Sequence, residues 1–159
     1  MRQFAAVGLV LIAALAMPDL RAEVQPSVSD PAFLAEPTTI LSQRDADRLL
    51  DNSGITLQWI GWDDRGQASV RPDARGVWYL SGSQRGERGE LEVDGIITEI
   101  GEGYFTLDGT VSIQNTPDAG RDCRAHKKWH FAITQNRRYY RLREFEWCDG
   151  LTDYVDIYF

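Results

Sequence analysis

Basic side chains are concentrated in one stretch of an otherwise acidic sequence. The 159 residues include 17 lysines and arginines against 24 aspartates and glutamates, which gives a formal net charge of -7, yet residues 121–143 hold eight basic residues and one acid. The planar guanidinium of arginine matches carboxylate and phosphate groups. We therefore predict a site for an anionic or amphipathic ligand formed by Lys128, His130, Arg141 and Arg143, with Tyr139 and Trp59 as aromatic contacts.

The same basic side chains also have acidic neighbours on the last predicted strand. Tyr154, Asp156 and Tyr158 stand at alternate positions and would therefore share one face of a strand. Like charges directly opposite one another destabilise a sheet, so the basic residues need solvent, interleaved acids or a bound anion. The sequence leaves two interpretations open, an anion site or one half of an ion-pair ladder.

The two cysteines predict a disulfide and, with it, a hairpin register. Cysteines of exported proteins form disulfides because the compartment is oxidising. A two-residue turn at Gln135-Asn136 would place Cys123 directly opposite Cys148. In that register the four predicted basic residues face one another on one side of the hairpin, Lys128 with Arg143 and His130 with Arg141.

His126 and His130 have the i, i+4 spacing of helical metal sites. Their segment is rich in aromatic residues and is typical of a strand, in which the two side chains would lie about 13 Å apart. We therefore predict no metal site, no cofactor and no catalytic residue. The alternative is a hydrolase that uses His130 with one of the many carboxylates.

Hydrophobic periodicity predicts a mostly β fold with one short N-terminal helix. Ser42 is a good N-cap and Asn52-Ser53-Gly54 a stop signal, so we expect a helix between them. From residue 55 onward apolar residues alternate with polar ones, which indicates strands. The predicted strands are residues 55–62, 76–81, 90–100, 104–114, 124–134, 138–147 and 153–159. Consecutive strands with short links predict an antiparallel meander that forms a small barrel or barrel-like sheet.

The first 22 residues predict an export signal. A basic residue near the start precedes an apolar run over residues 4–16, and Ala22 offers a cleavage point. That run is shorter than the ~20 residues that a membrane-spanning helix needs. Residues 23–37 contain three prolines and predict a flexible linker, and residues 38–159 predict a single β-rich domain. We therefore expect a periplasmic or secreted protein.

Two short segments resemble known barrel families. Gly76-Val77-Trp78 resembles the G-x-W of lipocalin-type barrels, which implies a protein that binds small apolar ligands. The last predicted strand ends in Phe159, with Ile157 and Val155 at alternate positions before it. This strand resembles the C-terminal strand of bacterial outer-membrane barrels, which implies a barrel of at least about eight strands.

These observations lead to one preferred function. We predict an exported, non-enzymatic, barrel-like domain that binds an anionic or amphipathic small molecule or a cell-envelope protein. The alternatives are an envelope hydrolase, a structural or inhibitor-like interaction protein, and a small outer-membrane barrel. Nucleic-acid binders must neutralise phosphates, so we expect no nucleic-acid partner for this acidic chain. We expect membrane association only in the last alternative.

Overall fold

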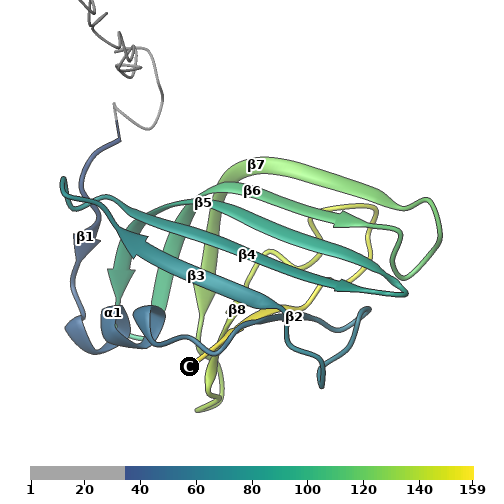
Figure 1. The fold of residues 1–159 in the computed structure, drawn as a ribbon, viewed down its shortest axis with the longest axis horizontal. Coiled ribbons are helices and arrows are strands. Elements are labelled where there is room, and N and C mark those ends of the chain that lie inside the picture. Colours follow the sequence, from purple (N-terminus) through teal and green to yellow (C-terminus); the bar gives the residue numbers. More distant parts are fainter. Residues whose placement is uncertain (1–34) are drawn as a thin grey trace, which may run out of the picture. The chain divides into compact units, whose positions relative to one another are not determined.

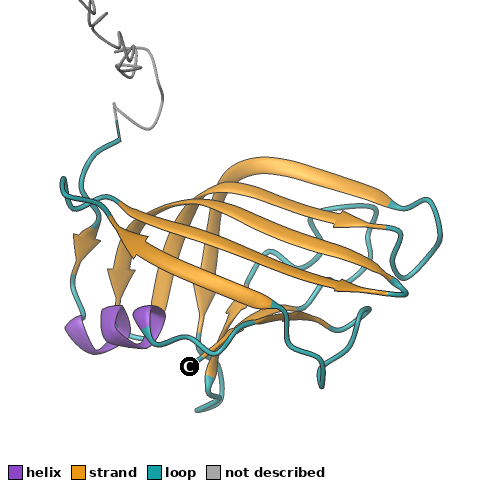
Figure 2. Ribbon diagram, in the orientation of Figure 1, coloured by secondary structure: helices purple, strands orange, loops and turns teal. Residues whose placement is uncertain are grey.

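Strands, nearly all antiparallel, make up about half of the residues in the computed structural model, which describes residues 35–159 (Figures 1 and 2). The strands are β1 (Thr39–Ile40), β2 (Ile55–Leu57), β3 (Gln67–Pro72), β4 (Trp78–Gly86), β5 (Gly89–Gly101), β6 (Tyr104–Gln114), β7 (Asp122–Ala132), β8 (Tyr139–Leu142) and β9 (Val155–Tyr158). The helix of the described part is α1 (Gln43–Leu50). The predicted fold class, a mostly β antiparallel meander with one short N-terminal helix, is confirmed.

The sheet curls until its two edge strands almost meet. Its strands follow the order β2-β9-β8-β7-β6-β5-β4-β3, while β1 pairs in parallel with the end of β5. At the seam, Ile55 on β2 and Gly66, just before β3, exchange two backbone hydrogen bonds with N–O distances of 3.1 and 2.8 Å. The sheet is therefore nearly closed into a barrel.

Gln84 on β4 holds the seam together, although its side chain is almost fully buried. Its Nε2 donates to the carbonyl oxygens of Gly61 and Asp64 at 2.9 and 2.7 Å, and its Oε1 accepts from a backbone N–H of β2 at 2.6 Å. Gly66 passes so close to β4 that a Cβ there would lie 2.0 Å from the carbonyl oxygen of Ser83. Because glycine has no Cβ, it permits this approach, and the two residues together fix where the sheet closes.

Helix α1 lies at one end of the barrel (Figure 1). It begins at the predicted N-cap, Ser42, whose Oγ accepts from the backbone N–H of Asp45 at 3.3 Å. Ala46 and Leu49 are fully buried in the core. The carboxylate of Asp45 is also buried and accepts a hydrogen bond from the hydroxyl of Tyr140 on β8 at 2.7 Å. Both apolar burial and a charge-assisted hydrogen bond therefore join the helix to the barrel.

Replacing Tyr140 with phenylalanine is expected to lower the free energy of unfolding by about 1.5–3 kcal/mol at pH 7. Burial opposes the charge on Asp45, but hydrogen bonds from Ser42, Tyr140 and Arg48 outweigh it and keep the pKa of that carboxyl below its usual value. Stability from a lowered carboxyl pKa is present above the unfolded-state pKa and is lost as the pH falls through the folded-state value. Urea unfolding should therefore show a larger loss at pH 7 than at pH 2. Equal losses at both pH values would contradict this account, and Tyr79→Phe, at an exposed hydroxyl, is the control.

Apolar side chains fill the interior of the barrel. The alternation predicted on β6 is present, and its inward side chains are fully buried, namely Phe105, Leu107, Val111 and Ile113. The ring of Phe105 stacks on Phe131 with centroids 4.7 Å apart and meets Tyr140 edge-on at 5.4 Å. The described barrel therefore encloses an apolar core.

The structure differs from the predicted strands most clearly in four places, and one of them is β4, which runs on to Gly86 where the prediction ends at Ser81. The predicted strand 55–62 ends at Leu57, because two following N–H groups bond back to the carbonyl oxygen of that residue and turn the chain. The sequence pattern does not predict β3, whose apolar residues are only Ala68 and Val70 before Pro72 ends the strand. The predicted strand 138–147 is shortened to β8, after which the chain leaves the sheet.

The register of β7 and β8 is two residues away from the predicted one. The predicted turn is present, since Gln135 and Asn136 both have positive φ, 55° and 56°, as a type I′ turn requires. The first paired residues after the turn are Ala132 and Arg141. Two residues, 133–134, separate Ala132 from the turn, whereas four residues, 137–140, separate the turn from Arg141. A shift of two leaves the side chains of β7 and β8 on their predicted faces, so these faces are correct and the predicted cross-strand partners are wrong.

The described residues Ala35–Phe159 form one compact unit. The predicted export signal, residues 1–22, and most of the predicted linker, residues 23–37, lie outside the described residues. In the described part, α1 is too short and too polar to cross a membrane as a helix.

Candidate functional site

The predicted site residues lie on different elements and have different surroundings. Lys128 and His130 are exposed on β7, Tyr139 and Arg141 lie on the outer face of β8, Arg143 follows β8, and Trp59 follows β2. The predicted pairs Lys128–Arg143 and His130–Arg141 are not formed. The backbone N–H of Arg143 donates to the carbonyl oxygen of His130 at 2.8 Å, and Arg141 is in register with Ala132.

Arg141 forms an ion pair with the last strand, as the ladder interpretation predicts. Its Nε and Nη2 donate to the two carboxylate oxygens of Asp156 at 2.7 and 2.6 Å. The Arg141 side chain is 12% exposed and the Asp156 side chain 0%. Burial raises the pKa of Asp156 above its usual value, although Arg141 opposes that shift. The guanidinium also lies 4.1 Å from the ring centroid of Tyr154, so the charge of Arg141 is neutralised and its position is fixed.

Lys128 and His130 stay on the outer surface of β7. Lys128 is in register with Asp108 on the neighbouring strand β6. The imidazole of His130 lies 5.3 Å from the ring of Tyr104, and the backbone N–H of His130 donates to the carboxylate of Glu144 at 3.2 Å. This carboxylate is therefore held by the backbone rather than by the ring, and the hydrolase alternative gains no support from it.

Trp59 contacts a buried ion-pair cluster to which sequence reasoning assigned no role. Its Nε1 donates to Asp153 at 3.0 Å. Arg121, whose side chain is 4% exposed, forms two hydrogen bonds to Asp153, both 2.9 Å long. It forms two more to Asp149, at 2.8 and 2.9 Å, and one to the carbonyl oxygen of Thr116 at 3.0 Å. All five guanidinium N–H donors are thus used, which makes Arg121 a structural clamp between β7 and the loop before β9.

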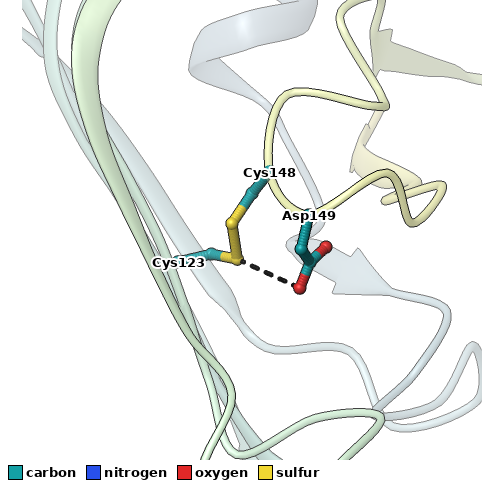
Figure 3. A group of neighbouring side chains, drawn as sticks. All are labelled: Cys123, Cys148 and Asp149. Atoms are coloured by element: carbon teal, nitrogen blue, oxygen red, sulfur yellow. Dashed lines mark hydrogen bonds between the residues drawn. A yellow bond between two sulfur atoms is a disulfide. The ribbon is translucent and has the colours of Figure 1, made fainter.

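The predicted disulfide between Cys123 and Cys148 is formed beside this clamp (Figure 3). It joins the start of β7 to the loop after β8, because strand pairing stops at Leu142 before the chain reaches Cys148. Among the described residues, the two cysteines and Asp149 form a group whose possible metal-ligand atoms all lie within 4.8 Å of one another. The two sulfurs are bonded to each other and both Asp149 oxygens to Arg121, so this set holds no free ligand atom for an ion.

A cavity of about 1030 Å³ lies between α1 and the β7–β8 turn, and we call it the arginine groove. Its lining residues are Arg44, Asp47, Arg48, Asp51, Gly103, Ile133, Asn136, Arg137, Arg138 and Phe159. Four arginines against two aspartates make the lining locally positive on a chain whose formal net charge is -7. The apolar parts are the side chain of Ile133 and the ring of Phe159.

The four arginines of the groove differ in how firmly they are engaged. Arg44 donates to Glu102 at 3.2 Å in a solvent-exposed pair, which contributes little to stability. Arg48 is engaged more firmly, because it pairs with the buried Asp45 at 3.0 Å and lies 4.5 Å from the ring centroid of Phe159. The exposed Arg138 has no side-chain hydrogen-bond or ion-pair partner among residues 35–159. The groove therefore offers at least one free guanidinium in a concave, mixed apolar and positive setting.

Sequence reasoning missed the groove because its arginines come from distant parts of the chain. Arg44 and Arg48 have i, i+4 spacing on α1 and share one side of that helix. Arg137 and Arg138 follow the β7–β8 turn, about ninety residues later, and the fold brings the two pairs together. The adjacent arginines beside a predicted turn were a usable local signal, but nothing in the sequence pointed to α1 as the opposite wall.

A second cavity, of about 320 Å³, shares one side chain with the arginine groove, and we call it the aromatic pocket. Its lining residues are Trp62, Arg137, Tyr139, Arg141, Asp156 and Tyr158. Arg137 lines both cavities. Two of the predicted site residues, Tyr139 and Arg141, therefore meet here, together with Trp62, which is 42% exposed.

Comparison with known proteins assigns a family. The model of the PM1083 family matches residues 37–159. The chain is similar to the uncharacterized protein PM1083 of Pasteurella multocida (strain Pm70), with 33% identity over 114 residues, which cover 70% of this chain and 74% of the relative. No solved structure matches. The matched region contains the whole described barrel from β1 onward, and the chain belongs to the PM1083 family.

Proposed function

We propose that this chain is a non-enzymatic binding protein whose arginine groove accepts an anionic group. The supporting observation is Arg138, an exposed arginine without a side-chain partner in the described domain, at the edge of a cavity that three further arginines line. An arginine donates in a planar fork that matches carboxylate or phosphate oxygens. The mixed lining of guanidinium groups and the Phe159 ring suits an amphipathic ligand better than a bare inorganic ion.

The groove is favoured over the predicted basic face of β7 and β8 for an electrostatic reason. The charge of Arg141 is neutralised by a buried carboxylate at 2.6 Å, and binding an external anion there would mean competing with that pair. Arg44, by contrast, lies 3.7 Å from the buried Asp45, with which Arg48 already pairs at 3.0 Å. Its own hydrogen bond goes to Glu102 in a pair whose side chains are 60% and 85% exposed. An incoming anion can replace such a pair at small cost.

We also propose that the protein works in the periplasm or outside the cell. The Cys123–Cys148 disulfide supports this location, because disulfides persist in oxidising compartments and are rare in the cytosol. The position of the bond in a well-packed part of the domain, beside the Arg121 clamp, suits a structural bridge. The expected ligand is therefore an anionic or amphipathic molecule, or an envelope protein that presents an acidic group.

Replacing Arg44 and Arg138 together with glutamine is expected to weaken the binding of pyrophosphate about tenfold or more, which corresponds to about 1.4 kcal/mol. Isothermal titration calorimetry at low salt gives the dissociation constants, and affinity should fall as salt is added. The matched control is Arg88→Gln with Arg124→Gln, which removes the same charge from exposed residues outside the groove. Equal weakening in both double variants, or wild-type protein that binds no pyrophosphate, would contradict the proposal.

A further inference from the structure

We propose that the aromatic pocket is a sugar-binding subsite, so that pocket and groove together bind an acidic saccharide. This inference rests on the proposed function, because it assigns the acidic part of the ligand to the arginine groove. The two cavities share Arg137, whose Nη1 donates to the hydroxyl of Tyr139 and whose Nη2 donates to Gln135 at 2.9 Å. A single ligand can therefore contact both cavities on the two sides of one fixed side chain.

The wall of the pocket presents an exposed tryptophan from an anchored loop. Trp62 is 42% exposed, although its indole is one of the largest apolar groups in the chain. The loop is not free to fold the ring away, because Gln84 holds the carbonyl oxygens of Gly61 and Asp64 on either side of Trp62 at 2.9 and 2.7 Å. An exposed aromatic ring held in place by buried hydrogen bonds is typical of a surface that binds a ligand.

The floor of the pocket offers hydrogen-bond donors without net charge. Two of the five N–H donors of Arg141 are used by Asp156, and the other three have no partner among the described residues. The guanidinium plane is fixed, with its centre 5.0 Å from the ring centroid of Tyr139 and 5.7 Å from that of Trp62. Because Asp156 neutralises the charge, this floor favours neutral acceptor oxygens over a second anion.

These features together match a pyranose ring. The C–H face of such a ring is apolar enough to lie on Trp62, and its hydroxyl oxygens can accept from Arg141. A purely hydrocarbon ring would bury the free N–H donors of Arg141 without acceptors, which costs free energy. The volume of about 320 Å³ is at the lower end of small-molecule sites and suits one ring, whereas the groove of about 1030 Å³ has room for further units.

The two subsites differ in charge, and this difference sets the class of ligand. The pocket contains a neutralised ion pair, while the groove contains four arginines against two aspartates. A saccharide whose carboxylate groups reach the groove, while one ring presents its hydroxyl oxygens to the pocket, would satisfy both. Trigalacturonate is therefore the probe for the pair of subsites, galactotriose is its neutral counterpart, and pyrophosphate reports on the groove alone.

Calorimetry with the three probes tests the sugar subsite. We expect trigalacturonate to bind at least about tenfold more tightly than pyrophosphate or galactotriose. Trp62→Ala should weaken trigalacturonate binding about tenfold or more and leave pyrophosphate binding unchanged. Leu41→Ala, at a residue that is 65% exposed, is the control for loss of an exposed apolar side chain. Trp62→Phe keeps an aromatic ring and should retain most of the affinity.

The other possible results distinguish a failure of the sugar subsite from a failure of the anion groove. If Trp62→Ala binds trigalacturonate as tightly as wild type while pyrophosphate still binds, the sugar subsite is overturned and the anion groove stands. Adenosine monophosphate is a fourth ligand to titrate: if it binds more tightly than trigalacturonate in a Trp62-dependent way, the pocket takes a nucleobase and the saccharide class is overturned. If no probe binds the wild-type protein, both proposals fail.

Discussion

Replacing Arg121 with methionine is expected to lower the free energy of unfolding by about 3–5 kcal/mol. The change leaves the fully buried carboxylate of Asp153 with one remaining side-chain donor, the indole N–H of Trp59. Burial opposes the charge on Arg121, but hydrogen bonds and charge from Asp153 and Asp149 outweigh it and raise the pKa of the guanidinium above its usual value. The guanidinium therefore stays charged in the folded protein, and its removal takes two hydrogen bonds from the fully buried carboxyl group of Asp153.

Urea unfolding of the variant, followed by tryptophan fluorescence, measures this loss. Arg124→Met, at an exposed position three residues further along the chain, is the matched control and should change stability by less than about 0.5 kcal/mol. Asp149→Asn should cost less than Arg121→Met, because the Asp149 side chain is 41% exposed. If Arg121→Met is as stable as Arg124→Met, the ion pairs of Arg121 with Asp149 and Asp153 do not hold the loop to the barrel.

Removing the disulfide by replacing both Cys123 and Cys148 with serine is expected to cost about 3 kcal/mol, the chain-entropy value for a loop of this size. The two cysteines are 25 residues apart in sequence. The bond and the Arg121 clamp hold the same loop, between β8 and β9, to the start of β7. Removing the disulfide and replacing Arg121 with methionine should therefore cost less unfolding free energy together than the sum of their separate costs. The reason is that either change alone already releases part of the same loop.

Thermal unfolding of the wild type with and without a reducing agent gives an independent measure. A melting temperature that does not change on reduction would contradict a stabilising role for the bond. A triple variant that loses the sum of the two separate effects, within error, would contradict the shared loop. The fold itself should persist without the bond, because the buried core residues lie on α1 and the strands, and the loop adds only the partly buried Trp147 and Cys148.

Much of the fold was predictable because its signals are local. The N-cap at Ser42, the alternation on β6 and the turn at Gln135-Asn136 each depend on a few neighbouring residues, and the structure contains all three. Strand β3 was not predictable, because its two apolar residues, Ala68 and Val70, form too short a pattern. It exists because the neighbouring strand β4 supplies hydrogen bonds to a segment that has a weak preference of its own.

The site was less predictable than the fold because it depends on contacts between distant residues. Sequence patterning placed Arg141 and Tyr139 on the same outer face, and the structure brings them together in the aromatic pocket. The sequence did not decide whether Arg141 pairs with Asp156 or binds a ligand. That choice depends on the pairing of strands β8 and β9, which places Arg141 beside Asp156. Sequence patterning also did not join Arg44 to Arg138, which face one groove only after the barrel has formed.

The most direct test of the account is to locate where an anion binds. Backbone amide resonances of the ¹⁵N-labelled protein, titrated with pyrophosphate, report the site residue by residue. If the anion binds in the arginine groove, we expect saturable shifts at Gly103, Ile133 and the arginines after the β7–β8 turn, Arg137 and Arg138, with little change at Lys128 and His130. Shifts centred on Lys128 and His130, or no saturable shifts at all, would contradict the assignment of the anion site to the arginine groove.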